Sequence, residues 1–385
     1  MGHQVEVIAG PPYPEVSKGV TLHRLKSLST YHPQSSLRTN LPKVRSLVDL
    51  YELGATRVGV FADPLAFSLR AYSKLKELSR QQRFDIIHDN QCLAYGLLLM
   101  KKLKVPVVAT IHHPLPIDKQ ADLDQANGLM HKWRVKKFYS FILMQSLVAR
   151  RLKRVITVSQ SAAGEIERFF KVAPDKLRVV YNGIDTDVYK KSVKARESKN
   201  GLIMVANIGD RKKGVIYLLK ALQLLKQDKI KLTIVDDAER HSSYADDAGP
   251  QPSYGLSLVK KFGLEELVSF TGRVTQDELV EYYSRAEIAV VPSLYEGFGL
   301  PAAEAMACEV PVIVTSGGAL PEVVGEAGIL VPPGDADALA TAIKQLLNNK
   351  QLQRQMGEVG RRRVESKFSW KQAAEAILEI YQELS

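Results

Sequence analysis

The stretch Glu287-Ile-Ala-Val-Val-Pro-Ser-Leu-Tyr-Glu-Gly-Phe-Gly-Leu-Pro-Ala-Ala-Glu304 joins two kinds of local structure through a glycine turn. Residues 288–291 are uniformly apolar, which is typical of a strand that is buried on both faces. Pro301 is well placed to begin a helix, because proline fits the first helical turn. A buried strand that runs through a glycine turn into a helix predicts an α/β fold.

The same turn has the features of a site for an anionic ligand that carries hydroxyl groups. Gly297 and Gly299 flank Phe298, so the backbone there can approach a ligand closely. Amide groups at the start of a helix have free donors and partial positive charge, which suit a phosphate. Glu296 precedes the turn, and we expect Glu304 in the first turn of the helix, so two carboxylates flank these amides.

Short runs rich in valine and isoleucine alternate with helical patterns along the rest of the chain. The predicted strands of the first half are 5–9, 85–88, 105–110, 155–158 and 177–180. Those of the second half are 202–206, 231–235, 268–271, 288–291 and 310–314. Apolar strands separated by helices predict parallel sheets covered on both faces. Two such series predict two Rossmann-like domains, whose ligands belong at the carboxyl ends of the strands.

The composition narrows the classes of partner and location. The chain has 385 residues, of which 45% are hydrophobic and 25% are charged, with a net charge of +11. It has no run of 18 apolar residues and no basic-then-apolar leader, so we expect no membrane span, no export and a cytoplasmic location. The positive charge suits a nucleotide or an anionic lipid, and without a nucleic-acid-binding motif we expect no nucleic acid partner. Cys92 and Cys308 lack metal-ligand spacing and are expected to be buried hydrophobes.

The residues from Glu296 to Met306, EGFGLPAAEAM, resemble the signature of the retaining GT-B glycosyltransferases of family four, or glycosyl transferases group 1. The resemblance implies two Rossmann-like domains with parallel sheets that face a central cleft. It places an acceptor-side domain at 1–183, a donor-binding domain at 184–366, and at 367–385 a helix that crosses back to the first domain. It also implies that the family's first strand and glycine-rich loop are missing before Gly2.

By this resemblance we expect a hexosyltransferase that moves a sugar from a nucleotide-diphosphate-sugar donor to an acceptor hydroxyl, with retention at the anomeric carbon. The acceptor stays open between a glycan and a lipid-linked molecule, in the synthesis of cell-surface glycans or glycolipids. The nucleotide sugar is a substrate, and neither a cofactor nor a metal is expected. Two alternatives remain, which are a sugar-nucleotide epimerase of similar fold and a non-catalytic sugar-nucleotide-binding protein. The sequence predicts no oligomeric state.

The resemblance also implies roles for single residues. Glu296 would hold sugar hydroxyls, and Glu304 would accept bonds from the ribose hydroxyls. Lys213 would neutralise the diphosphate as it leaves. His112 would face the transferred sugar, because either nitrogen of an imidazole can donate. His113, beside it, is the competing candidate.

The other predicted contacts with the donor are made largely by backbone. They are Gly297, Phe298, Gly299 and Leu300 at the helix start, Gly317 and Gly318 in a second glycine turn, Asn207, and Val274. Ala206 and Asn207 stand where the family has Gly-Arg, so a second cation is unassigned, and Arg211 or Lys212 could supply it. Asp185-Thr-Asp187 resembles the metal-binding motif of the GT-A architecture, but in a predicted interdomain link a turn or helix-cap role is expected.

The segment from His131 to Arg154 combines eight lysine and arginine residues with aromatic ones. A basic, aromatic helix could dock on anionic lipid. At 100° per residue, however, the apolar residues of 135–148 surround the axis and the charges gather at the two ends. That pattern predicts a mostly buried helix, and peripheral contact with the inner face of the membrane stays the alternative. The polar stretch 238–253 is predicted to be a surface insertion.

Overall fold

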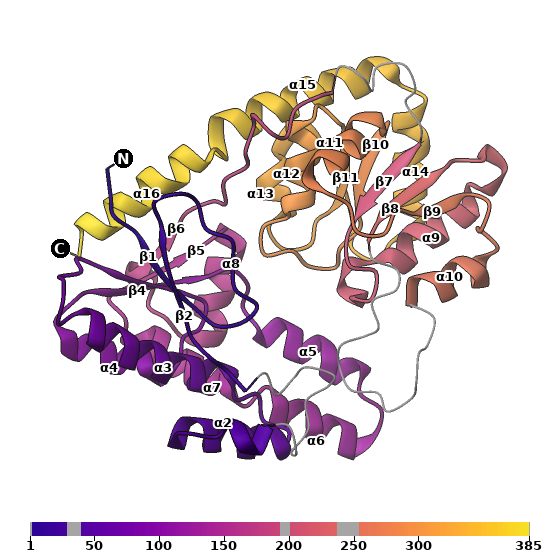
Figure 1. Cartoon of the computed structure of the whole chain (residues 1–385). Coiled ribbons are helices and arrows are strands. Elements are labelled where there is room, and N and C mark those ends of the chain that lie inside the picture. The colour runs from indigo at the N-terminus through magenta and orange to yellow at the C-terminus, as the bar shows by residue number, and fades with distance from the viewer. Residues whose placement is uncertain (1, 29–39, 193–200, 237–253, 385) are drawn as a thin grey trace. The chain divides into compact units, whose positions relative to one another are not determined.

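A computed structural model describes residues 2–28, 40–192, 201–236 and 254–384 (Figure 1). The chain forms two compact units. Unit 1 comprises Met1–Thr157, Ala163–Val179 and Glu379–Ser385, and unit 2 comprises Val158–Ala162 and Val180–Leu378. The predicted insertion at 238–253, and residues 193–200 of the predicted link, lie outside the described residues.

Unit 2 is built on a six-stranded parallel sheet in the order β12-β11-β10-β7-β8-β9. Its strands are β7 (Leu202–Val205), β8 (Leu232–Val235), β9 (Val268–Phe270), β10 (Ile288–Val291), β11 (Val312–Thr315) and β12 (Gly328–Val331). The order of the strands reverses between β7 and β10. The carboxyl ends of these two strands are therefore the topological switch point, where open α/β sheets bind their ligands.

Helices cover both faces of this sheet. The helices of unit 2 are α9 (Val215–Leu224), α10 (Tyr254–Phe262), α11 (Gln276–Arg285), α12 (Leu300–Ala307), α13 (Leu320–Val324), α14 (Ala336–Leu347) and α15 (Lys350–Lys367), with the short helices η6 (Arg211–Lys213), η7 (Lys226–Asp228) and η8 (Gly325–Ala327). The last helix, α16 (Trp370–Gln382), begins in unit 2 and ends in unit 1. Alternate residues of β10 enter different cores. Ile288 and Val290 join the core beneath α9 and α14, whereas Ala289 and Val291 join the core beneath α12 and α13. Burial on both faces explains the continuous apolar run of β10.

Unit 1 contains two parallel sheets. One pairs β1 (Glu6–Ala9) with β2 (Thr21–Arg24), and the other has the order β3-β4-β5-β6. The strands of the larger sheet are β3 (Ile87–Asn90), β4 (Val107–Ile111), β5 (Arg154–Thr157) and β6 (Leu177–Val179). The helices are α2 (Leu47–Arg57), α3 (Asp63–Leu78), α4 (Tyr95–Met100), α5 (Pro116–Gln125), α6 (Gly128–Phe138) and α7 (Phe141–Arg151), with η1 (Leu41–Lys43), η2 (Lys101–Leu103), the π-helix η3 (Ile166–Phe170) and η4 (Pro174–Lys176). Helix α8 (Gln160–Glu165) begins in unit 2 and ends in unit 1.

The structure confirms the predicted α/β class with parallel sheets in two Rossmann-like units. Each of the ten predicted strands corresponds to an observed one within about two residues at either end, the scatter usual for such boundaries. Two strands were not predicted. β2 carries polar side chains and has no buried residue, so it lacks the apolar run of a central strand. β12 does carry an apolar run, Ile329-Leu330-Val331, which the prediction missed.

The prediction of one mostly buried helix in the segment 131–154 is wrong. Two helices form there, α6 and α7, with Tyr139 and Ser140 between them. All eleven residues of α6 are described and none is buried, whereas α7 buries Phe141, Ile142, Met144 and three further residues. The prediction treated the residues of both helices as one helix, so it combined the exposed residues of α6 with the buried residues of α7.

The C-terminal helix runs from unit 2 into unit 1, as predicted. Residues up to Leu378 belong to unit 2, and Glu379–Ser385 belong to unit 1. Glu383 accepts hydrogen bonds from Arg154 at 2.7 Å and from Arg178 at 3.0 Å, which fixes the end of the helix to the edge of the β3–β6 sheet. Among the described helices, none combines the length and the apolar character that crossing a membrane would require.

Candidate active site

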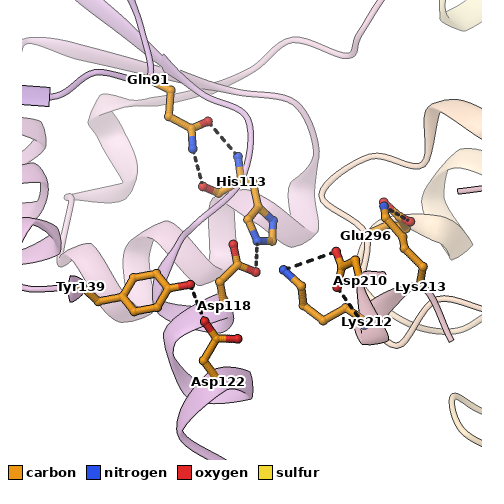
Figure 2. Close-up of polar contacts among 9 residues, drawn as sticks. All are labelled: Gln91, His113, Asp118, Asp122, Tyr139, Asp210, Lys212, Lys213 and Glu296. Carbon is orange, nitrogen blue, oxygen red and sulfur yellow. Dashed lines mark hydrogen bonds and ion pairs between the residues drawn. The ribbon is translucent and has the colours of Figure 1, made fainter. Parts of the chain in front are cut away.

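A buried carboxylate and a lysine meet at the switch point of unit 2. Glu296 lies in the loop between β10 and α12 and is 8% exposed. Its Oε1 accepts hydrogen bonds from the Ser293 hydroxyl at 2.7 Å and from Lys213 Nζ at 2.8 Å (Figure 2). A buried carboxylate requires such partners. The structure therefore brings together two of the three predicted catalytic residues.

Glycine at position 214 lets the loop that carries Lys213 approach the end of β10. Gly214 has φ of +69°, and a Cβ atom added to it would lie 2.0 Å from the carbonyl oxygen of Pro292. The Leu294 amide donates to the Lys212 carbonyl at 2.7 Å, which joins the two loops a second time. Any other residue would push the loops apart, so the lysine side chain could no longer reach Glu296 in the same way.

A second glycine turn holds the backbone of Glu296. Gly318 has φ of +68°, and an added Cβ atom would lie 2.2 Å from the Glu296 carbonyl oxygen. The Ala319 amide donates to the same carbonyl at 2.9 Å. At Gly317 an added Cβ atom would lie 2.4 Å from the Leu294 carbonyl oxygen. Both glycines therefore have a structural role, and their contact with a donor stays a prediction.

The turn before α12 leaves the start of the helix without a capping side chain of its own. Gly299 is the N-cap residue with φ of +100°, and the helix begins at Leu300, followed by the predicted Pro301. The carbonyl of Gly297 accepts a hydrogen bond from the Ser159 hydroxyl at 2.7 Å. The Phe298 ring is buried, 5.5 Å from the Phe368 ring centroid, so Phe298 can offer a ligand only its backbone.

Glu304 lies one turn further along α12 than predicted. The expectation of the first helical turn is wrong, because the helix begins at Leu300 and Glu304 is its fifth residue. The Tyr283 hydroxyl donates to Glu304 Oε2 at 3.0 Å. Burial raises the pKa of Glu304. Burial, together with the Glu304 carboxylate, also raises the pKa of Tyr189 to about 12, so this tyrosine stays a hydrogen-bond donor.

The basic side chains after β7 have different partners. The Arg211 guanidinium lies 5.0 Å from the Tyr254 ring centroid, and Lys212 Nζ lies 3.9 Å from Asp210 (Figure 2). Lys213 pairs with Glu296, as described. These contacts do not select Arg211 or Lys212 as the second cation, which stays unassigned.

The last two predicted donor contacts occupy turns at the ends of strands. Asn207 accepts a hydrogen bond from the Gly209 amide at 2.9 Å, which shapes the turn after β7. Val274 is partly buried against the core beneath α12, directly before Thr275, which caps α11. A role of either residue in binding a nucleotide stays a prediction.

Unit 1 presents His112 directly after β4. Its Nε2 lies 2.6 Å from Asn90 Oδ1, and its backbone amide donates to Gln91 Oε1 at 2.7 Å. Although the residue is exposed, the surrounding protein removes part of the water around the ring and lowers its pKa. His112 is therefore neutral at neutral pH, and its ring can donate a hydrogen bond without adding a positive charge to the site.

The competing candidate, His113, is held by its own neighbours. His113 Nε2 lies 2.8 Å from Asp118 on α5, and Gln91 Nε2 donates to the His113 carbonyl at 2.9 Å (Figure 2). Gln91 thus holds the backbone of both histidines, with φ of +61°. In the same view the Tyr139 hydroxyl donates to Asp122 at 2.7 Å and fixes α5 to the end of α6.

Two ionisable residues at the end of β3 were not predicted. His88 is enclosed between Tyr381 and Thr110, whose hydroxyl oxygens lie 2.5 Å and 2.6 Å from its ring nitrogens. Burial, and secondarily His112, lowers its pKa to about 4. Burial also raises the pKa of Asp89 to about 6, while its carboxylate accepts from the Leu93 amide at 2.9 Å. The signal available in the sequence was the polar run His88-Asp-Asn-Gln91, which begins at the last residue of a predicted strand.

Two further predictions are settled by local contacts. Asp185 accepts hydrogen bonds from the Asp187 amide at 3.1 Å and from the Val188 amide at 3.2 Å, which confirms its predicted turn role. Cys308 is buried, as expected. Cys92 is only half-buried, and its thiol donates to the Pro64 carbonyl at 3.2 Å.

Comparison with known proteins gives matches along the whole chain. The family "Glycosyltransferase Family 4" matches residues 1–188, and "Glycosyl transferases group 1" matches residues 185–363. The MMP alpha-(1->4)-mannosyltransferase of Mycolicibacterium hassiacum is 36% identical over 391 residues, which cover 99% of this chain and 90% of that protein.

Solved structures show the same arrangement of the backbone. Sucrose-phosphate synthase of Thermosynechococcus elongatus has a TM-score of 0.73 at 24% identity, over 100% of this chain and 89% of that one. HepE of Anabaena, solved in complex with UDP-glucose, has a TM-score of 0.66 at 21% identity, over 82% of each chain. At such identities the likeness establishes the fold.

Proposed function

The chain belongs to the family four (group 1) glycosyltransferases of the GT-B fold, and we propose that it moves a hexose from a nucleotide-diphosphate-sugar donor to an acceptor hydroxyl with retention at the anomeric carbon. The contact of Lys213 with the buried Glu296 at the switch point of unit 2 carries this proposal. A nucleotide sugar offers a diphosphate to the lysine and sugar hydroxyls to the carboxylate. The open start of α12 adds amide donors for the same phosphates.

Lys213 can serve the donor without giving up Glu296. An ammonium group has three donors, and one of them bonds Glu296. When the bond between the anomeric carbon and the phosphate oxygen breaks, negative charge grows on the diphosphate and the sugar gains oxocarbenium character. A cation fixed beside the diphosphate stabilises that charge as it forms. Retention would follow from attack by the acceptor on the face that the diphosphate leaves, and we assign no covalent nucleophile.

Glu304 and His112 complete the proposed roles. Glu304 would accept bonds from the ribose hydroxyls, and the Tyr283 hydroxyl holds one of its oxygens in place. His112 would donate from its neutral ring to the transferred sugar. Gly297 to Leu300, Gly317, Gly318, Asn207 and Val274 are proposed to surround the donor through their backbone.

The choice of sugars to test comes from the relatives. One relative is named as a mannosyltransferase, and HepE was solved with UDP-glucose. Mannose and glucose donors are therefore the first candidates, each with uridine, guanosine and adenosine diphosphate. The acceptor is proposed to be a hydroxyl of a glycan or of a lipid-linked sugar, in the cytoplasmic synthesis of cell-surface glycans or glycolipids.

A thermal-shift panel of these donors tests the proposal. We expect one donor to raise the Tm selectively, because a ligand that binds only the folded state stabilises it. Glu304→Gln should weaken that shift, whereas the exposed Glu358→Gln should keep it. His112→Ala should keep the shift and lose transfer, measured as release of the nucleoside diphosphate with acceptor present.

Other outcomes would contradict a transferase. A failure of every uridine, guanosine and adenosine diphosphate sugar to shift the Tm would remove the donor site. Conversion of the sugar nucleotide to an isomer without acceptor would identify an epimerase. Binding without turnover, across glycan and lipid-linked acceptors, would identify a binding protein.

A further inference from the structure

Helix α2 faces the solvent with its apolar side. Leu47, Leu50 and Tyr51 recur at helical spacing and are exposed, as is Val58 at the C-cap, and Leu47 is 85% exposed. The opposite side of the helix buries Glu52, which forms an ion pair with Arg70 at 2.5 Å, as does Asp49. A surface helix normally turns its apolar side to the core. Helix α2 buries Leu53 in this way but also leaves Leu47, Leu50 and Tyr51 exposed, so its outer side is suited to an apolar partner.

Helix α6 combines exposed apolar side chains with positive charge. Leu129 is 89% exposed and Trp133 is 55% exposed, and Met130 lies between them. Four basic residues share the helix, namely Lys132, Arg134, Lys136 and Lys137, and its sequence from Gly128 to Phe138 contains no acidic residue. Lys137 Nζ lies 4.5 Å from the Trp133 ring centroid, so charge and aromatic surface are adjacent.

Aromatic packing joins the two helices. Phe61, just after α2, lies 5.3 Å between ring centroids from Phe138, the last residue of α6, and 5.1 Å from Phe141 of α7. Both helices lie at the lower edge of unit 1 in Figure 1. We call the exposed residues on these helices the docking face. It consists of Leu47, Leu50, Tyr51, Val58, Leu129, Met130 and Trp133 with Lys132, Arg134, Lys136 and Lys137.

We propose that the docking face binds the surface of an anionic lipid bilayer. Apolar side chains of α2 and α6 would enter the boundary between headgroups and acyl chains, while the basic side chains of α6 meet lipid phosphates. A second copy of the chain is a poorer partner, because a symmetric contact would bury the basic side chains of α6 from both copies in an interface to which the docking face supplies no acidic residue. Nucleic acid would pair the charges but leave the aliphatic side chains of α2 without a partner.

Tryptophan fluorescence tests the proposal without any sugar substrate, so its outcome is independent of the transferase reaction. The chain has two tryptophans, Trp133 and Trp370, and Trp370→Phe leaves Trp133 as the single reporter. Vesicles of phosphatidylcholine with phosphatidylglycerol should shift its emission to the blue, and vesicles of phosphatidylcholine alone should not. In Trp133→Phe the remaining Trp370, which lies in unit 2, should show no shift.

Co-sedimentation with the same vesicles measures how much the charge of α6 and the apolar side chains of α2 contribute to membrane binding. Lys132→Gln combined with Lys136→Gln should weaken binding about twenty-fivefold, since each charge near an anionic surface contributes about fivefold. Lys260→Gln combined with Lys261→Gln, on α10 of unit 2, removes the same charge and should change binding less than about twofold. Leu47→Ser should weaken binding, whereas Leu224→Ser, at an exposed leucine of unit 2, should not.

Several results would overturn the proposal. One is that both double lysine variants weaken vesicle binding equally. Another is that the chain binds vesicles while the emission of Trp133 stays unchanged. A third is that the Leu47→Ser variant binds vesicles as tightly as the unmodified chain. A concentration-dependent Trp133 shift without lipid would assign the face to a second copy. Tighter binding to an oligonucleotide than to anionic vesicles would assign it to nucleic acid.

Discussion

Lys213 and Glu296 form an ion pair in the structure. The carboxylate oxygen that receives Lys213 also receives the Ser293 hydroxyl, so Glu296 keeps one partner when the lysine is removed. Loss of Lys213 should therefore affect the chemistry more than the fold, because Lys213 is itself partly exposed. This asymmetry makes the lysine the better position for a kinetic test.

Lys213→Met should lower kcat by about 10²–10³, the usual effect of removing a group that stabilises developing charge. Release of the nucleoside diphosphate from the donor that gives the largest Tm shift would measure it. Lys220→Met, on the exposed side of α9, is the matched control and should leave kcat unchanged. Equal rates for the two variants would exclude Lys213 from stabilisation of the leaving group.

His88 is the residue at which pH should act on stability. Its pKa falls from the ordinary 6.5 to about 4, chiefly through burial and secondarily through His112. Between these values the unfolded chain binds a proton at His88 and the folded chain does not, so the free energy of unfolding falls as the pH falls from 6.5 to 4. Asp89 opposes this slope, because its pKa is raised to about 6 and the folded chain binds that proton first.

His88→Gln should separate the two effects. Glutamine can keep hydrogen bonds to Thr110 and Tyr381 but does not titrate. Relative to the unmodified chain, the free energy of unfolding of the variant should rise by up to about 3 kcal/mol as the pH falls from 6.5 to 4. The reason is that each unit of the pKa shift of His88 corresponds to about 1.4 kcal/mol. Urea unfolding across this range measures the gain. Parallel pH profiles for the two proteins would contradict the assignment.

Among the elements, the turn η6 depends on a glycine for two reasons that a control can separate. Gly214 and Gly263 both have positive φ, of +69° and +62°. An added Cβ atom meets backbone at Gly214, whereas at Gly263 its nearest neighbour is Lys226 Nζ at 3.4 Å, the end of a flexible side chain. Strain from the backbone conformation is thus common to both positions, and the clash with the Pro292 carbonyl, just after β10, is specific to Gly214.

Gly214→Ala should therefore lower the free energy of unfolding by about 2–4 kcal/mol, and Gly263→Ala by about 1 kcal/mol. Because the clash displaces Lys213, Gly214→Ala should also reduce the Tm shift produced by the donor, and Gly263→Ala should not. Urea unfolding and the thermal-shift panel measure both effects. Equal losses of stability would mean that the close approach to Pro292 contributes nothing.

The sequence predicted elements where one physical signal dominated. The apolar run of β10, the glycines around Phe298 and the proline after Gly299 predicted the strand, the turn and the helix start of unit 2. The same reasoning failed at Glu304, because the apolar pattern does not say at which residue of the glycine turn the helix begins. It failed at α6 because helical periodicity alone cannot reveal a break at Tyr139.

The roles of single residues were harder to predict from the sequence than the helices and strands. Residue type and spacing placed Lys213 after β7, but its contact with Glu296 depends on two loops that meet only in the folded chain. His88 gave a weak signal, since its environment is built by Tyr381, 293 positions away in the sequence. The side chains of Arg211 and Lys212 take their directions from Tyr254 and Asp210, which no local pattern predicts.

For the whole molecule, the two units carry different proposed surfaces. The residues proposed to bind the donor, Glu296, Lys213 and Glu304, all lie in unit 2, and the proposed docking face lies in unit 1. His113 and Asp118 connect the end of β4 to α5, and Tyr139 connects α5 to the end of α6, so the docking face is joined to the His112 region within one unit. Taken together, the two proposals assign a lipid-linked acceptor to unit 1 and the nucleotide-sugar donor to unit 2.

Hydrogen exchange measured on the intact chain should therefore show two separate footprints. A nucleotide sugar that raises the Tm should slow exchange in the segments 211–216 and 296–304 of unit 2, because ligand binding suppresses local opening of the loops it contacts. Anionic vesicles should instead slow exchange in α2 and α6 of unit 1. Glu304→Gln should remove the first footprint and keep the second, whereas Lys132→Gln with Lys136→Gln should do the opposite. Protection of α2 and α6 by the nucleotide sugar alone, or of 296–304 by vesicles alone, would contradict the assignment of donor and membrane to separate units.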